Sequence, residues 1–294
     1  MTLFLNLRAS SVGGILASDV KLCRDADPTP LNPVVLENAA RGRDVLLVAH
    51  GFNVPQADGI NRLSWWEQRL QPSASALFVG ILWPGDSSWI RAIDYPLEGN
   101  EAIGSGKMLA PYIDRHLASA VSVSFASHSL GARVVLETIK QVQRPVRDLV
   151  MMAGAIDSTC LADEYRQAAA KVTGEISLLA SEGDHVLKYA FPAGNFLAGI
   201  VTRGSPYWHA ALGLDGPETP YPATLQGPWE IPIGWAYDHG DYFGNAAPVG
   251  PQIAPPVDVP PPPPPPPPIP AVPPAPVNWK PAWSAAFAAT RLRR

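Results

Sequence analysis

Residues 121–142 read VSVSFASHSLGARVVLETIKQV, and the interpretation of the whole chain starts from this stretch. Residues 121–125 have the character of a strand, and residues 131–142 repeat apolar side chains at helical spacing. Between the two stands the pentapeptide S-H-S-L-G, at residues 127–131. The pattern therefore predicts a strand that turns directly into a helix, with small and polar residues at the turn.

The same alternation of strands and helices continues on both sides of this unit. Short apolar runs predict further strands at residues 44–50, 76–83, 146–153 and 175–180, and helical spacing occurs at residues 102–117 and 162–171. Such β-α-β alternation predicts the α/β class, with a doubly wound, mostly parallel sheet and helices on both faces. The first forty residues are expected to add an antiparallel hairpin at one edge.

The pentapeptide supplies the first chemical group. Sheets of this kind place their sites at the carboxyl ends of the strands. The turn resembles the nucleophile elbow G-x-S-x-G of α/β-hydrolases, with Ser127 in place of the first glycine. The nucleophile of an elbow sits in a strained turn, so its neighbours two positions away must be small, as Ser127 and Gly131 are. An isolated S-x-S-x-G is a weak motif, but its place between a strand and a helix predicts that Ser129 is a nucleophile.

Two backbone amides are expected to bind the oxyanion that forms when Ser129 attacks a carbonyl group. One is the amide of Leu130, at the start of the helix, where unpaired N–H groups favour negative charge. The other is implied by His50-Gly51-Phe52, which resembles the oxyanion loop of the superfamily and places the amide of Phe52 in the site. His50 is then a structural brace, although an ordinary strand-to-helix turn would explain the tripeptide taken alone.

A serine nucleophile needs a base, and the base needs an orienting carboxylate. In this superfamily the acid follows the serine along the chain. The strand at residues 175–180 runs into a loop that contains Asp184, which we predict to be the acid. Glu182 and Asp157 are the competing candidates, and the choice between Asp157 and Asp184 stays open at this point.

The predicted base is His239, the last histidine before a proline-rich segment. It lies late in the chain, with glycine and aromatic residues nearby, as expected of a loop that carries a catalytic base. His185 and His209 are the alternatives. His185 adjoins the predicted acid and would open the next helix, and His209 stands beside a tryptophan in an irregular stretch.

The resemblance to the α/β-hydrolase superfamily covers about residues 40–245. It is nearest to a little-characterised group of bacterial serine hydrolases with an H-G-F loop, a Trp-Pro pair (Trp83 and Pro84 here), an S-H-S-x-G elbow and a late histidine loop. The resemblance implies cleavage of small-molecule carboxylic esters through an acyl-enzyme, without a metal or other cofactor. Two alternatives are a non-catalytic binding module and an amidase, peptidase or acyltransferase with the same triad.

The chain is expected to contain one hydrolase domain followed by a tail. Residues 1–247 form the domain, residues 248–281 are dominated by proline and predict a polyproline II linker, and residues 282–294 form a short terminal segment with helical spacing. The linker serves either as a spacer, which we favour, or as a docking ligand for a protein partner.

Composition excludes several classes of protein. The 294 residues are 47% hydrophobic and 16% charged, with a formal net charge of −4, which does not indicate a nucleic-acid partner. Cys23 and Cys160 are too few for a cysteine metal site and are expected to be ordinary thiols. No apolar run is long enough to span a bilayer, and the N-terminus does not read as a signal peptide, so a cytoplasmic location is expected; leaderless export stays open.

Overall fold

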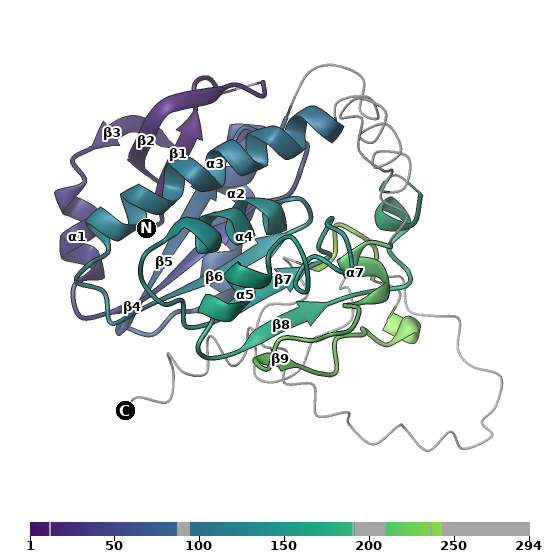
Figure 1. The fold of residues 1–294 in the computed structure, drawn as a ribbon. Coiled ribbons are helices and arrows are strands. Elements are labelled where there is room, and N and C mark those ends of the chain that lie inside the picture. Colours follow the sequence, from purple (N-terminus) through teal and green to yellow (C-terminus); the bar gives the residue numbers. More distant parts are fainter. Residues whose placement is uncertain (12, 87–94, 190, 192–209, 236, 243–294) are drawn as a thin grey trace, which may run out of the picture.

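A nine-stranded sheet forms the centre of the protein (Figure 1). The computed structural model describes residues 1–294 except 12, 87–94, 190, 192–209, 236 and 243–294. The strands lie side by side in the order β3-β2-β1-β5-β4-β6-β7-β8-β9. Their bounds are β1 Leu3–Arg8, β2 Leu16–Arg24, β3 Asp27–Leu31, β4 Asp44–Ala49, β5 Ala76–Leu82, β6 Ser122–His128, β7 Leu149–Met152, β8 Ile176–Leu179 and β9 Leu225–Gln226.

The seven neighbouring strands β1-β5-β4-β6-β7-β8-β9 are all parallel, which confirms the predicted class. β2 is antiparallel to both β1 and β3, so the expected edge hairpin is present. The hairpin differs from the prediction in one respect, because β1 pairs in parallel with β5 and thereby extends the central sheet. All six residues of β1 are buried, as is usual for a strand covered on both faces.

The helices cover both faces of the sheet. α3, α4 and α5 lie on the face turned toward the viewer in Figure 1, and α2 lies behind the sheet. The bounds are α1 Val34–Ala40, α2 Gln56–Leu70, α3 Tyr95–His116, α4 Gly131–Gln141, α5 Arg166–Lys171 and α7 Leu212–Asp215, with a 3₁₀ turn at Ile233–Trp235.

Several predicted boundaries were wrong by a few residues. α3 begins seven residues before the predicted start at residue 102, and α5 begins four residues after the predicted start at residue 162. The predicted strand at residues 146–153 narrows to β7, and Val146 contributes only an isolated bridge to Val172. Apolar character alone does not show where the hydrogen bonds between strands begin. Val146 and Ala153, at the two ends of the predicted strand, are buried although they lie outside β7.

The central strands and α4 supply much of the core around which the site is built. All six residues of β4 are buried, and Val134, Val135, Leu136 and Ile139 of α4 are fully buried. This packing places the start of α4 firmly against the carboxyl ends of β4 and β6.

A close approach between α3 and α4 depends on Gly106. A Cβ atom at this position would lie 2.9 Å from the carbonyl oxygen of Val134 and 2.9 Å from the amide nitrogen of Thr138, both backbone atoms of α4. Backbone atoms cannot move aside as the end of a side chain can. The absence of a side chain at Gly106 therefore sets the distance between the two helices.

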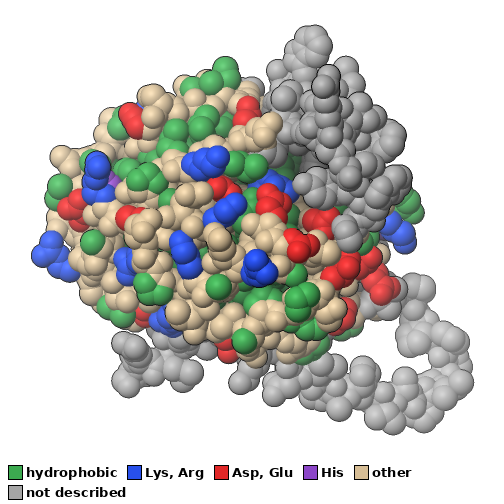
Figure 2. Space-filling model, viewed as in Figure 1, with side chains coloured by type: hydrophobic (Ala, Val, Ile, Leu, Met, Phe, Trp, Pro, Cys, Tyr) green, Lys and Arg blue, Asp and Glu red, His purple; other side chains and the backbone are tan. Residues whose placement is uncertain are grey.

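The surface charge, the cysteines and the lengths of the helices complete the description of the fold. Lys and Arg side chains are spread over the face shown in Figure 2 as separate spots. Cys23 and Cys160 are free and buried. In the part of the chain that is described, no helix combines the length and the apolar character that crossing a bilayer requires. The predicted linker and terminal segment, residues 248–281 and 282–294, lie outside the described residues.

Gly106→Ala is expected to lower the free energy of unfolding by about 1–3 kcal/mol, because the added methyl group overpacks the contact between α3 and α4. Gly104→Ala on the same helix is the matched control. Its Cβ would meet only the side-chain tip of Leu16 at 3.2 Å, so the substitution should leave stability unchanged or raise it by up to about 1 kcal/mol. Urea denaturation of both variants measures the difference, and equal stabilities would contradict this account of the contact.

Candidate active site

The turn between β6 and α4 has the backbone conformation of a strained elbow. Ser129 has a φ of 53°, in the left-handed region that non-glycine residues seldom occupy. Its amide donates to the carbonyl oxygen of Met152 at 2.9 Å, which ties the turn to the end of β7. Ser127, which replaces the first glycine of the motif, is buried, and its hydroxyl lies 3.4 Å from the carbonyl oxygen of Val150. A serine at this position is therefore compatible with the turn.

Two glycines allow the elbow to rest against the loop that follows β4. A Cβ atom at Gly131 would lie 2.4 Å from the carbonyl oxygen of His50. A Cβ atom at Gly51 would lie 2.9 Å from Cβ of Ser129. The small size of Gly131 thus serves the contact with a neighbouring loop, beyond the approach of strand and helix that the sequence suggested.

The ring of His50 is buried inside this loop. Its Nδ1 lies 2.8 Å from the carbonyl oxygen of Gly51, and a carbonyl oxygen only accepts, so Nδ1 carries the hydrogen. The ring stacks on Trp83 at 5.8 Å between centroids, and the indole N–H of Trp83 donates to the His50 carbonyl at 2.8 Å. Complete burial lowers the pKa of His50 to about 3, so the ring is neutral at physiological pH. The imidazole therefore lies inside the loop, bonded to one of its carbonyl groups.

The amides of Phe52 and Leu130 lie on the two segments that these glycines bring together. No hydrogen bond from either amide to another described residue is found. Leu130 is the residue immediately before α4, so its N–H group lies at the positive end of the helix dipole. As far as the described residues show, both amides can therefore donate to a bound anion.

Arg8 contacts the same loop through its guanidinium group. Its side chain is fully buried and forms an ion pair with Asp86. It also donates to the carbonyl oxygens of Trp83, at 2.9 Å, and of Val54, at 3.3 Å. One guanidinium thus joins the end of β1 to the loops after β4 and β5. The sequence analysis did not find this residue, since nothing in the local pattern marks a buried arginine.

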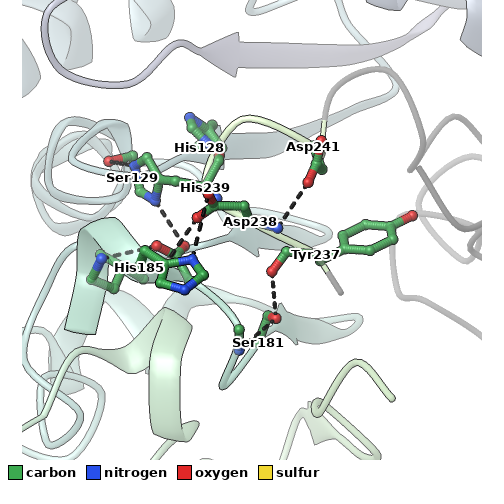
Figure 3. A network of polar contacts seen from close by, with 11 residues as sticks. His128, Ser129, Ser181, His185, Tyr237, Asp238, His239 and Asp241 are labelled. Carbon is green, nitrogen blue, oxygen red and sulfur yellow. Dashed lines mark hydrogen bonds and ion pairs between the residues drawn. The ribbon is translucent and has the colours of Figure 1, made fainter. Parts of the chain in front are cut away.

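Three side chains meet at the elbow, and two of them, Ser129 and His239, are labelled in Figure 3. His239 Nε2 lies 2.8 Å from Ser129 Oγ, and His239 Nδ1 lies 2.8 Å from Asp184 Oδ2. Asp184 has no solvent exposure, and its Oδ1 accepts the amide of Leu187 at 2.9 Å. Asp184 and Ser129, which lie 55 and 110 positions before His239 in the sequence, are therefore within hydrogen-bond distance of the two different nitrogens of its ring.

The loop that carries His239 is held at three successive residues (Figure 3). The carbonyl oxygen of Tyr237 accepts the hydroxyl of Ser181 at 2.8 Å, and the Asp238 carboxylate accepts the amide of His185 at 3.0 Å. The carbonyl oxygen of His239 lies 2.7 Å from His128 Nε2. The sequence analysis missed Ser181 and His128 as supports, because their partners are backbone atoms distant in sequence.

The alternative candidates for the acid and the base are not hydrogen-bonded to His239 or Ser129 where the structure describes them. Asp157 uses Oδ1 to accept both the amide and the hydroxyl of Thr159, at 2.9 and 2.8 Å, and no hydrogen bond joins it to His239 in the described structure. Glu182 is exposed. His185 opens a helical segment, and its side chain is 71% exposed. His209 lies outside the described residues. Among the residues that are described, no group of three or more His, Cys, Asp or Glu is placed to hold a metal ion.

A comparison with known protein families identifies the family of this chain. Residues 31–205 match the model of a family described as "Alpha/beta hydrolase of unknown function (DUF900)". The chain belongs to this family. The matched region contains Ser129 and Asp184 and ends before His239. No curated protein matches the chain.

Solved structures with similarity to this DUF900 protein include an uncharacterised protein from Bacillus cereus, at 14% identity and a TM-score of 0.37, over 61% of this chain and 53% of that one. The chain thus spans about half the length of the B. cereus protein. A predicted CIB-like hydrolase from Thermoplasma acidophilum is 13% identical, with a TM-score of 0.38, over 76% of this chain and 83% of that one. A poly(3-hydroxybutyrate) depolymerase from Bordetella parapertussis is 16% identical, with a TM-score of 0.35, over 70% and 79%.

Arg8→Met is expected to lower the free energy of unfolding by about 3–5 kcal/mol, because it leaves the buried carboxylate of Asp86 without its partner. Arg133→Met is the control. Arg133 pairs with Glu164 at 2.7 Å, but both side chains are partly exposed, and the loss should be at most about 1 kcal/mol. Urea denaturation compares the two, and equal losses would show that the Arg8 pair does not support the loop.

The stability of the protein is expected to fall as the pH decreases from about 6.5 toward 3. The pKa of His50 is lowered from 6.5 to about 3 by burial, so the unfolded chain binds more protons than the folded protein between these values. One such histidine contributes a slope of up to about 1.4 kcal/mol per pH unit. His50→Asn, which keeps a donor for the Gly51 carbonyl, should reduce the slope between pH 5 and 6 by roughly that amount. The slopes of variant and parent should coincide between pH 8 and 9, and an unchanged slope at pH 5–6 would contradict the assignment.

Proposed function

We propose that this protein is a serine hydrolase that cleaves carboxylic esters through an acyl-enzyme. Ser129 is the nucleophile, His239 is the general base, and Asp184 orients His239. The observation that carries the proposal is the pair of 2.8 Å contacts from the two nitrogens of His239, one to Ser129 Oγ and one to Asp184 Oδ2. Membership in an α/β-hydrolase family supports it.

The first half-reaction follows from the positions of the protons. Asp184 accepts a hydrogen bond from Nδ1 of His239, which leaves the lone pair of Nε2 directed at the hydroxyl of Ser129. Nε2 takes the hydroxyl proton while Oγ bonds to the ester carbonyl carbon. The carbonyl oxygen becomes an oxyanion, and the amides of Phe52 and Leu130 donate to it.

Collapse of this intermediate expels the alcohol, which takes the proton from His239 Nε2. The acyl group remains on Ser129 Oγ. A water molecule then gives a proton to the same nitrogen and attacks the acyl carbon, and a second oxyanion forms between the same two amides. Its collapse returns the proton to Ser129 and releases the acid. Burial of Asp184 beside a positive imidazolium makes the carboxylate most effective in the charged intermediates, when the stabilisation is needed.

Ser129→Ala is expected to abolish labelling by a fluorophosphonate and to lower kcat/KM toward p-nitrophenyl esters by at least about 10³-fold. Asp184→Asn, which changes the tautomer of His239 and preserves the shape, should lower kcat by about 10³- to 10⁴-fold. Ser73→Ala, a serine in the loop before β5, is the control and should retain both labelling and turnover.

A panel that includes p-nitroanilides and alcohol acceptors distinguishes an esterase from an amidase or an acyltransferase with the same triad. Absence of a Ser129 adduct on folded wild-type protein, together with absence of turnover, would refute the proposed hydrolase.

A further inference from the structure

The imidazole of His128 is the last side chain of β6 and immediately precedes Ser129. It is 5% exposed, and its Nε2 lies 2.7 Å from the backbone carbonyl oxygen of His239. Because that oxygen can only accept, Nε2 must carry the hydrogen and donate it. The mechanism assigns no role to this histidine, although it lies within the polar network of Figure 3.

The ring of His128 also contacts the other parts of the site. Its centroid is 4.9 Å from that of His239 and 5.8 Å from that of Tyr242. On the opposite segment, a Cβ atom at Gly51 would come within 2.8 Å of its Nδ1. The elbow, the histidine loop and the oxyanion loop therefore pack around a single ring.

The anchors of the histidine loop divide into two sets. Ser181 and the amide of His185 hold Tyr237 and Asp238, and both anchors lie in the segment that carries Asp184. They fix His239 relative to the acid. The bond from His128 is different, because it ties the backbone of His239 to the strand that carries Ser129. A second hydrogen bond between this loop and the elbow is the one from Ser129 Oγ to His239 Nε2.

The ring is suited to this task because it stays neutral. Burial, with a smaller contribution from the charge of nearby His239, keeps the pKa of His128 well below its usual range. The single hydrogen of the neutral ring is the one on Nε2, which donates to the His239 carbonyl. When His239 becomes positive during the reaction, His128 adds no second positive charge beside it.

We infer that His128 is a positioning residue, which sets the distance between the base His239 and the nucleophile Ser129 by holding the backbone carbonyl of His239. This inference rests on the proposed function of the two residues. It makes the residue between the two serines of the elbow a determinant of the rate of proton transfer, without contact with the substrate.

Two variants of nearly equal length separate the hydrogen bond from the volume of the ring. In His128→Gln the amide nitrogen stands as many bonds from Cβ as Nε2 does and can donate to the same carbonyl. His128→Met reaches as far but has no donor. We expect kcat of the Met variant to fall about 10- to 100-fold with little change in KM, because a displaced base costs rate and not affinity. The Gln variant should recover most of the wild-type kcat.

His116→Gln is the matched control, since His116 lies at the end of α3 and bonds to Glu37 at 2.8 Å. It should leave kcat unchanged. Thermal unfolding of all three variants verifies that they are folded. Equal kcat values for the folded Gln and Met variants would overturn the inference, as would a wild-type rate in the Met variant.

A measurement on the wild-type protein remains decisive if the Met variant does not fold, and it does not depend on turnover. In ¹⁵N-histidine NMR, His128 should be a neutral imidazole with its hydrogen on Nε2 between pH 6 and 8. Observation of the Nδ1–H tautomer would overturn the inference. The Nε2–H tautomer in a protein that lacks all ester turnover would instead support the contact and refute the proposed function, so the two failures are distinguishable.

Discussion

The contact between the nucleophile turn and the loop after β4 is the constraint on which the rest of the site depends. Gly131 lies so near the carbonyl of His50, and Gly51 so near Ser129, that neither position has room for a side chain. The left-handed φ of Ser129 is part of the same arrangement, because it projects the hydroxyl from the turn toward His239. A strained residue of this kind persists only where its surroundings over-determine it, and here two parallel strands and a buried helix do so.

Support for this contact comes from residues that are far from the chemistry. Trp83 holds the His50 carbonyl and stacks on its ring, and Arg8 joins the loops after β4 and β5 through their carbonyl groups. Buried carbonyl groups in loops need donors, since an unpaired polar group in the interior costs free energy. A guanidinium offers five N–H groups in a fixed plane, so one arginine satisfies several carbonyls at once. The parallel addition of β1 to β5 is what brings Arg8 to this place.

The histidine loop is joined to the body of the protein by two backbone carbonyl groups and one side-chain carboxylate. Ser181, the amide of His185 and His128 hold three consecutive residues, and the first two lie beside Asp184. These three contacts fix the position of the loop beside Asp184 and Ser129. The carboxyl group of Asp238 in this network is exposed, whereas that of Asp184, which faces the imidazole, is buried.

The sequence by itself determined the fold class, the elbow and the loop His50-Gly51-Phe52, because these depend on local patterns of apolar periodicity and small residues next to strand ends. It also singled out Asp184 and His239, which the tertiary structure brings to opposite nitrogens of one ring. Only the tertiary structure decided that Asp157 caps its own turn, that β1 pairs in parallel with β5, and that Arg8 and His128 donate to distant carbonyls. The reason is physical: backbone carbonyls are the same at every residue, so a side chain that binds one leaves no pattern in the sequence of its partner.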